Sequence, residues 1–238
     1  MIYLKNLNKI YRIGENEQNI IKDIDLRIEK GEFVAVIGRS GAGKSTLLYL
    51  MSLLEFPSSG SIVIDDKEVS ELTDSDRTDY RLNNFGFVFQ EYALLPELNS
   101  IENVAVPLLM KGIKKKEAYK IAEEALNQVD LGDKLINLPG QLSGGEQQRV
   151  SVARAIAQKP KIIFADEPTA NLDTGRACEI FNIFMRLNRE GQTIVMVTHE
   201  REFAEMTHRI IELRDGKIIA DTRLEPTATN LCKKFRID

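Results

Sequence analysis

The chain has 238 residues, of which 43% are hydrophobic and 29% are charged, so it can bury a sizeable core and has the composition of an ordinary globular protein. Its net charge of -4 and its pI of about 5.5 exclude a strong electrostatic attraction to nucleic acid or to an anionic membrane surface. We therefore expect no nucleic-acid partner.

The N-terminus, the longest apolar stretch and the cysteines argue against several further classes of protein. Residues Met1 to Asn6 lack the apolar core of a signal peptide. The longest apolar stretch, Leu47 to Phe56, is much shorter than the ~20 residues of a membrane-spanning helix, so another chain supplies the spans if the protein acts at a membrane. Cys178 and Cys232 are far apart and have no histidine at zinc-ligand spacing, which predicts two reduced thiols and neither a disulfide nor a zinc site.

The first part of the chain predicts two kinds of strand. Apolar and polar residues alternate from Ile2 to Ile28 around the polar loop 14–17, which indicates antiparallel strands. Tyr11 precedes this loop, and on pattern alone it is equally well interpreted as a half-buried strand tyrosine or as a ligand contact. The continuous apolar run from Phe33 to Ile37 then predicts a buried strand.

The stretch after this strand has the spacing of a phosphate-binding loop, in which glycine, four residues and Gly-Lys-Ser precede a helix. Glycines permit the backbone angles that let successive N–H groups surround phosphate oxygens. We expect Lys44 to reach the terminal phosphates and Ser45 to place its hydroxyl on Mg²⁺. The buried strand before the loop disfavours the alternative of a glycine-rich turn with a stray lysine. The predicted nucleotide-binding residues here are Gly38, Arg39, Ser40, Gly41, Ala42, Gly43, Lys44, Ser45 and Thr46.

The middle of the chain changes from strands to helices. Strands are predicted at Ser61 to Asp65 and at Phe85 to Phe89, after which comes Gln90. Residues 91–148 carry apolar side chains at three- and four-residue spacing, which predicts an inserted helical subdomain. A break at Leu138-Pro139-Gly140 precedes its last helix, expected from Gln147 to about Gln158.

The C-terminal part returns to alternating strands and helices. Lys161 to Glu167 is a continuous apolar run that ends on two carboxylates, as in a parallel sheet covered on both faces. A helix from about Arg176 to Arg189 and the strand Thr193 to Thr198 follow, and His199 comes directly after that strand. A hairpin over Asp215-Gly216 ends the predicted elements, with His208 expected on a surface helix before it; the tail after Pro226 gives no prediction.

This order predicts an α/β fold, with a mainly parallel sheet flanked by helices, an antiparallel β subdomain and an inserted helical subdomain. We expect a single domain over residues 1–238, in which 1–90 and 149–238 form the core with the antiparallel part and 91–148 form the helical subdomain. Polar residues that directly follow strands should meet in one crevice; these are Gly38, Gln90, Asp166, Glu167 and His199.

The two carboxylates at the end of the strand have two interpretations. Taken alone, such a pair is most simply a helix cap. The phosphate loop upstream favours chemistry instead, with Asp166 at Mg²⁺ through coordinated water. Glu167 could then orient and polarise the attacking water, a role worth about 10²–10⁴-fold in rate.

Three segments together, Gly38 to Thr46, Leu142 to Glu146 and Phe164 to Pro168, resemble those of the nucleotide-binding subunits of ATP-binding cassette transporters. The resemblance covers about Met1 to Ala220 and implies a P-loop NTPase that hydrolyses ATP with Mg²⁺. Position by position, it implies that Tyr11 stacks on adenine, that Gln90 joins Mg²⁺ and senses the membrane partner, and that Glu167 is the catalytic base. It also implies that His199 contacts the γ-phosphate and that a loop communicates across a dimer, formed by Asn171, Leu172 and Asp173.

The resemblance also implies a homodimer. Ser143 and the glycines after it open a helix, whose N–H groups form a second anion site. In this family two chains pair head to tail, with ATP held between the phosphate loop of one chain and these residues of the other. The chain has one copy of each motif, so the dimer must be intermolecular. The residues that act in trans are Ser143, Gly144, Gly145 and Glu146, the last standing where the family often has glutamine.

Within the family, the segments around Gln90 and from Asp166 to Asp173 are similar to the macrolide-exporter and lipoprotein-releasing branch, apart from Ala170, where glycine is frequent. This similarity implies a motor subunit, cytoplasmic and peripheral on the inner face of the cell membrane, that drives a separate permease of exporter or mechanotransmission type. Residues 91–106 should form the groove that receives the permease. The alternative is the same ATPase regulating a division or cell-wall membrane complex without transport. A soluble cassette ATPase of translation or repair is disfavoured by the single cassette and the acidic balance.

Overall fold

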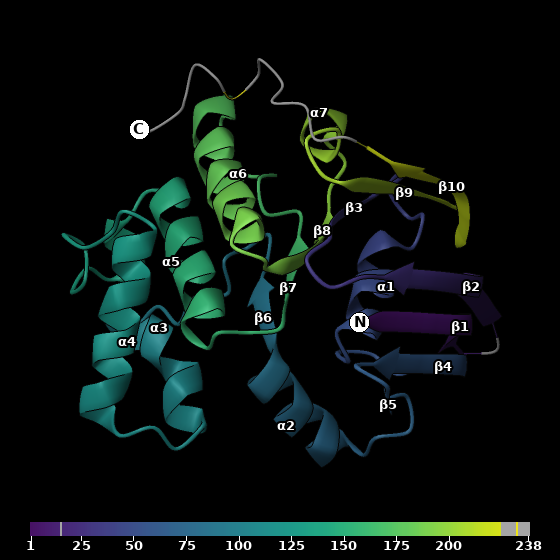
Figure 1. Ribbon diagram of the computed structural model, residues 1–238, viewed down its shortest axis with the longest axis horizontal. Helices are drawn as coiled ribbons and strands as arrows, with labels where there is room; N and C mark the ends of the chain where they lie inside the picture. Colours follow the sequence, from purple (N-terminus) through teal and green to yellow (C-terminus); the bar gives the residue numbers. More distant parts are fainter. Residues whose placement is uncertain (15, 225–231, 233–238) are drawn as a thin grey trace.

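The computed structural model describes residues 1–14, 16–224 and 232 (Figure 1). The strands are β1 Ile2–Ile13, β2 Asn16–Ile28, β3 Phe33–Ile37, β4 Ser59–Ile64, β5 Lys67–Glu68, β6 Phe85–Val88, β7 Ile162–Asp166, β8 Thr193–Val197, β9 Arg209–Arg214 and β10 Lys217–Arg223. The helices are α1 Lys44–Met51, α2 Asp74–Asn84, α3 Ser100–Met110, α4 Lys115–Gln128, the 3-10 turn η1 Pro139–Gln141, α5 Gly144–Ala157, α6 Thr174–Arg189 and α7 Arg201–Ala204.

A six-stranded sheet in the order β10-β9-β3-β8-β7-β6 forms the centre of the fold. All its neighbouring pairs are parallel except β10 with β9. Every residue of β3, β7 and β8 is buried, which explains their continuous apolar sequences. The predicted α/β fold is confirmed, and the carboxyl ends of β3, β6, β7 and β8 share one edge of the sheet.

The central sheet separates two hydrophobic cores, because alternate residues of a strand point to opposite faces. Phe33 and Ala35 of β3 face a core shared with α3, α4, α5 and α6. Val34 and Val36 face a second core, which α1 and the antiparallel sheet β2-β1-β4-β5 cover. The helical layer and the antiparallel sheet lie on opposite sides in Figure 1. Across the described residues, no helix has the length and apolarity that a bilayer span requires.

α5 begins at Gly144, earlier than the expected Gln147. Two glycines weaken helix propensity at this point, which is why the pattern suggested a later start. The helix nevertheless begins there because Ser143 and Glu146 form a capping box: the Ser143 hydroxyl accepts from the Glu146 amide, and the Glu146 carboxylate accepts from the Ser143 amide at 2.7 Å.

α2 was absent from the sequence prediction. Its only buried residue is an arginine, Arg77, so the helix carries no apolar period that would reveal it. The Arg77 guanidinium lies 3.7 Å from the centre of the Phe56 ring and donates to the main-chain oxygens of Leu53 and Glu55. The helix is therefore held in place by the buried Arg77 guanidinium, whose N–H groups satisfy main-chain oxygens of the turn after α1.

Two expectations about single residues are wrong. α7 ends at Ala204, so His208 lies in the bend before β9; it is half-buried, and its Nδ1 accepts from the Phe33 amide at 3.3 Å. Cys178 and Cys232 form a disulfide, with Cα atoms 5.3 Å apart and both residues buried. A pairing across 54 residues of sequence gives no spacing signal, because only the folded chain brings the two cysteines together. The rest of the tail after Pro226 is outside the described residues.

The predicted hairpin over Asp215-Gly216 is confirmed, and its turn contacts the phosphate loop (residues 38–46). The Gly216 amide donates to the Ala42 oxygen at 3.2 Å, and the Gly216 oxygen accepts from the Lys22 amide at 2.9 Å. Gly216 has φ +79°, and a Cβ atom there would lie 2.2 Å from the Ile20 oxygen. This glycine therefore lets β2, the hairpin and the phosphate loop meet.

We predict that Gly216→Ala lowers the free energy of unfolding by about 3 kcal/mol, because it combines backbone strain at positive φ with a clash against main-chain atoms. It should also weaken ATP binding through the displaced phosphate loop. Urea denaturation and equilibrium ATP titration measure the two effects. The matched control is Gly191→Ala, at φ +95° but with no described atom within 4 Å of the added Cβ, which should cost about 1 kcal/mol. Equal costs for the two variants would contradict the role of the contact.

Candidate functional site

The phosphate loop connects β3 to α1 and contains three glycines with positive φ, namely Gly38 at +154°, Gly41 at +77° and Gly43 at +98°. A Cβ on Gly38 would lie 2.3 Å from the Leu213 oxygen, so β9 packs directly against the start of the loop. Gly43 is the N-cap of α1 and provides no side-chain cap. The first amides of this helix can therefore donate hydrogen bonds to an anion.

Lys44 lies at the base of the loop and is only 9% exposed. Its Nζ donates to the Arg39 oxygen at 3.4 Å and lies 4.0 Å from Glu167 Oε1. The loop and the carboxylate that follows β7 therefore share one cation. This position joins the predicted phosphate-binding lysine to the predicted catalytic base.

Asp166 ends β7, is 7% exposed and accepts two hydrogen bonds from hydroxyls of α1. Ser45 Oγ donates to Oδ1 at 3.0 Å, as expected for two groups that share a metal ion. Tyr49 Oη donates to Oδ2 at 2.8 Å. Burial, and then the hydrogen bond to Asp166, raise the pKa of Tyr49. Sequence analysis missed Tyr49; the available signal was its place one helical turn after Ser45, on the same face of α1.

Glu167 follows Asp166 in a left-handed backbone conformation with φ +46°, and its amide donates to the Val197 oxygen at 2.9 Å. Its Oε2 is 2.8 Å from His199 Nδ1 and accepts from the His199 amide at 3.2 Å. Non-glycine residues in this conformation concentrate at functional sites. Since an ionised carboxylate only accepts, Nδ1 carries the hydrogen, and the 61% exposed imidazole presents Nε2 to a ligand.

Gln90 and the loop after β7 lie at the same edge of the sheet. Gln90 lies in the turn after β6 and is exposed, and its main-chain oxygen accepts from Asn171 Nδ2 at 3.2 Å. Leu172 packs against the helical core, and Asp173 caps α6 by accepting from the Arg176 amide at 3.1 Å. Among the described residues, no side-chain hydrogen bond links Gln90 to Ser45 or Asp166.

Tyr11, on β1, reaches the helix that begins at the phosphate loop. Lys9 Nζ lies 4.8 Å from the centre of its ring. Burial and the negative charge of Glu55 raise the pKa of Tyr11, and a hydrogen bond with Thr46 opposes them. The aromatic side chain of the antiparallel sheet is thus brought to the last residue of the phosphate loop.

The signature segment (residues 142–146) begins α5, which Figure 1 shows away from α1. The hydrogen bond from the Ser143 amide lowers the pKa of Glu146, whose carboxylate is thereby used within its own helix cap. Packing explains the glycines: a Cβ on Gly144 would lie 2.8 Å from Tyr92 Oη, and one on Gly145 would lie 3.1 Å from Arg176 Cδ. Within the described residues, no hydrogen bond or ion pair joins this segment to the phosphate loop.

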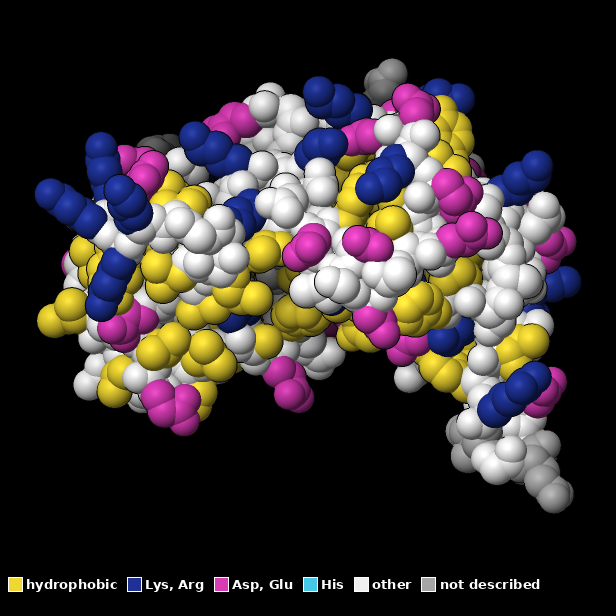
Figure 2. Space-filling view, turned by 90° about the horizontal axis from the view of Figure 1, so that it is seen from below, with side chains coloured by type: hydrophobic (Ala, Val, Ile, Leu, Met, Phe, Trp, Pro, Cys, Tyr) yellow, Lys and Arg dark blue, Asp and Glu magenta, His cyan; other side chains and the backbone are white. Residues whose placement is uncertain are grey.

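A groove of about 230 Å³ lies between β6, α3 and α5, and we call it the β6–α3 groove. Arg154 of α5 donates to the Tyr92 and Ala93 oxygens at 2.8 and 2.6 Å, which fixes two residues with positive φ beside it. Figure 2 shows apolar side chains gathered on the face seen from below, and Leu95, Leu109 and Met110 are exposed near the groove. The groove is lined by Phe87, Phe89, Ala93, Val106, Pro107, Arg154, Ala155 and Gln158.

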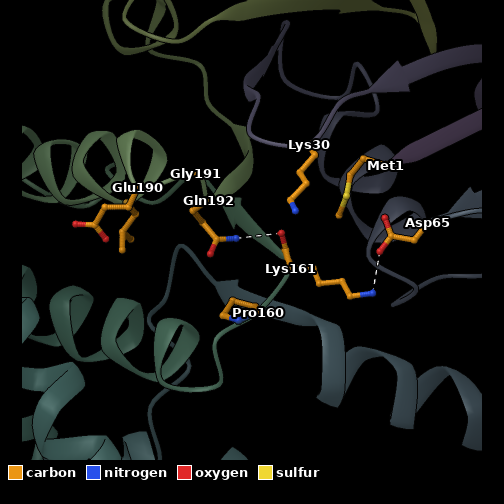
Figure 3. A pocket seen from close by; sticks show the side chains of 9 residues that line it. Met1, Lys30, Asp65, Pro160, Lys161, Glu190, Gly191 and Gln192 are labelled. Atoms are coloured by element: carbon orange, nitrogen blue, oxygen red, sulfur yellow. Dashed lines mark hydrogen bonds and ion pairs between the residues drawn. The ribbon is translucent and has the colours of Figure 1, made fainter.

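A larger hollow of about 440 Å³ lies at the other edge of the sheet, next to the residues that precede β3, β7 and β8 (Figure 3). It is crossed by an ion pair between Lys161 and Asp65 at 2.8 Å, and Gln192 donates to the Lys161 oxygen. The predicted reactive residues follow the carboxyl ends of the strands, so this hollow is not part of their site.

Comparison with known proteins agrees with this geometry. The ABC transporter family profile matches residues 21–170. The chain is 48% identical over 217 residues to the lipoprotein-releasing system ATP-binding protein LolD of Aquifex aeolicus, covering 91% of this chain and 95% of that protein. It is 46% identical to the macrolide export ATP-binding/permease protein MacB of Aggregatibacter actinomycetemcomitans, covering 94% of this chain but 35% of that protein.

Solved structures give the same result. The ATP-binding cassette MJ0796, in a dimeric post-hydrolysis state bound to ADP and Pi, has a TM-score of 0.88 and 40% identity to this chain, covering 94% of this chain and 99% of that chain. The resemblance to the macrolide-exporter and lipoprotein-releasing branch is thus confirmed. The chain belongs to the ABC transporter family as an ATP-binding subunit that hydrolyses ATP.

Proposed function

We propose that this chain is the ATP-driven motor subunit of a membrane transporter, and that it works as a head-to-tail homodimer on a separate permease. The observation that carries the proposal is the meeting of Lys44, the Ser45–Asp166 pair and the Glu167–His199 pair at one sheet edge. Cation, metal ligands and base are the groups that phosphoryl transfer to water requires.

Ser45 and Asp166 are the residues that hold Mg²⁺ in this proposal. Their oxygens already lie 3.0 Å apart, and hydroxyl and carboxylate oxygens suit a hard cation that takes its other ligands from phosphates and water. When bound, the ion neutralises charge on the phosphate oxygens. Gln90 remains our proposed additional ligand, since it enters from the neighbouring strand β6.

Glu167 acts as general base in this proposal, and His199 positions it. The carboxylate receives hydrogen bonds from both the ring and the main chain of His199, so its direction is fixed before substrate arrives. The exposed imidazole of His199 then contacts the γ-phosphate. Tyr11 supplies the stacking surface for adenine, on the side of the loop where Thr46 lies.

The separation of the two anion sites supports the proposed homodimer. The signature segment makes no described contact with the phosphate loop of its own chain, and a second copy would bring its Ser143, Gly144, Gly145 and Glu146 to the ATP. Asn171 donates to the Gln90 oxygen, and Leu172 lies next to Gly144 of the signature segment, so Asn171, Leu172 and Asp173 would communicate between the two sites. The dimeric state of the solved cassette supports this arrangement.

The permease is proposed to bind at the β6–α3 groove, which contains the expected segment 91–106 in part. The groove combines aromatic side chains with exposed apolar residues and adjoins Gln90, so movement there reaches the metal site. The names of the relatives, a lipoprotein-releasing system protein and a macrolide export protein, support an exporter type. We propose in addition a mechanotransmission-type permease, with this chain on the cytoplasmic face of the membrane.

We predict that Glu167→Gln lowers the ATP turnover number by at least about 10²-fold, because the amide cannot accept the proton of the attacking water. ATP binding should persist, and light scattering should detect a dimer that forms only with ATP. The control is Glu205→Gln, a carboxylate exposed on the surface beside Arg201, which should turn over normally. Normal hydrolysis by Glu167→Gln would overturn the assignment of the base.

We predict that tagged Glu167→Gln chain, trapped with ATP, recovers an integral-membrane protein from native membranes. Adding Val106→Glu should abolish recovery, because it places a carboxylate in the apolar groove, whereas Lys116→Glu on the exposed start of α4 should not. Mass spectrometry identifies what is bound, and a permease without transport activity would favour the regulatory alternative. Recovery of ribosomes or DNA without any membrane protein would contradict the motor proposal.

A further inference from the structure

We propose that Tyr49 is a positioning residue of the metal site, and that its hydroxyl fixes the carboxylate of Asp166 for Mg²⁺. This inference rests on the proposed function, in which Ser45 and Asp166 hold the ion. Neither the family resemblance nor the comparisons assign a role to Tyr49.

The geometry divides the Asp166 carboxylate between two donors. Tyr49 Oη donates to Oδ2 at 2.8 Å, and Ser45 Oγ donates to Oδ1 at 3.0 Å. The two donors are one turn apart on the same face of α1, so their spacing is set by the helix. Ser45 must turn its oxygen to the metal when the ion binds, whereas Tyr49 needs no change.

Because the two hydroxyls donate to different oxygens, Tyr49 would still donate to Asp166 after the ion binds. A carboxylate has about four lone-pair positions, so a hydrogen bond at Oδ2 leaves Oδ1 available on the Ser45 side. With Oδ2 held, the carboxylate plane cannot rotate freely about the Cβ–Cγ bond of Asp166. Because outer partners of metal-site residues typically change metal affinity by about 10–100-fold, the hydroxyl should affect the ion more than the fold.

The contribution of the Tyr49 ring to packing can be distinguished experimentally from the hydrogen bond of its hydroxyl. The ring is half-buried and packs against the core under the antiparallel sheet. The Tyr49 main-chain oxygen also accepts from the Leu54 and Glu55 amides, which closes the turn after α1. Tyr49→Phe keeps the ring and the main-chain bonds and removes only the hydroxyl.

The test measures metal binding directly, in Glu167→Gln protein saturated with ATP, with Mn²⁺ as the paramagnetic probe. Adding Tyr49→Phe should weaken Mn²⁺ binding about 10-fold by electron paramagnetic resonance, while metal-free ATP affinity and the Tm stay within error. The matched control is Tyr80→Phe, which removes another half-buried hydroxyl, 3.5 Å from the Ile64 oxygen. It should leave Mn²⁺ affinity unchanged.

Asp166→Asn separates the two proposals. If Asp166→Asn weakens Mn²⁺ binding and Tyr49→Phe does not, the metal site stands and the role of Tyr49 is overturned. If Asp166→Asn has no effect, the metal site itself is wrong, and the inference about Tyr49 is wrong with it. If Tyr49→Phe lowers the Tm and metal-free ATP affinity together with Mn²⁺ affinity, the residue is structural and the inference is overturned.

Discussion

The site depends on one constraint of the fold, the parallel pairing of β3, β8, β7 and β6, which places their carboxyl ends on one edge. Parallel sheets need both faces covered, so each strand is apolar until it leaves the two cores. The first polar side chains after burial ends are then the first that can reach a ligand. Glu167 and His199 occupy such positions, and buried Asp166 is the last residue of β7, so the ends of β7 and β8 set where the predicted site lies.

The second core links the antiparallel sheet to the phosphate loop. Arg209 of β9 donates to both carboxylate oxygens of Asp221 on β10 at 2.6 Å and to the Arg27 oxygen of β2 at 2.7 Å, which joins the end of β2 to the central sheet. The hairpin of β9 and β10 reaches the phosphate loop, because the Gly216 amide donates to the Ala42 oxygen. The predicted phosphate loop is thus held by a hairpin whose Gly216 lies 174 residues after Ala42 in the sequence.

The sequence predicted the structure of a segment correctly where a single physical rule decides that structure. Phe33 to Ile37 and the run before Asp166 had to be buried strands, and the spacing around Lys44 predicted a phosphate loop. Sequence patterns did not predict structure that depends on a contact between distant segments. α2 is held by buried Arg77, the Cys178–Cys232 disulfide joins segments that show no pairing signal, and Tyr49 matters only because α1 lies beside β7.

In the signature segment, the requirement for glycine and the capacity to bind an anion have different physical causes. Tyr92 and Arg176 fill the space where side chains on Gly144 and Gly145 would lie, so packing alone accounts for these glycines. The capping box, however, uses the amides of Ser143 and Glu146 and leaves those of Gly144 and Gly145 at the positive end of α5. Orphan amides need an acceptor, and no described residue of this chain supplies one. Water can satisfy them in a single chain, whereas in the proposed dimer the phosphate of an ATP bound to the second copy would satisfy them with charge.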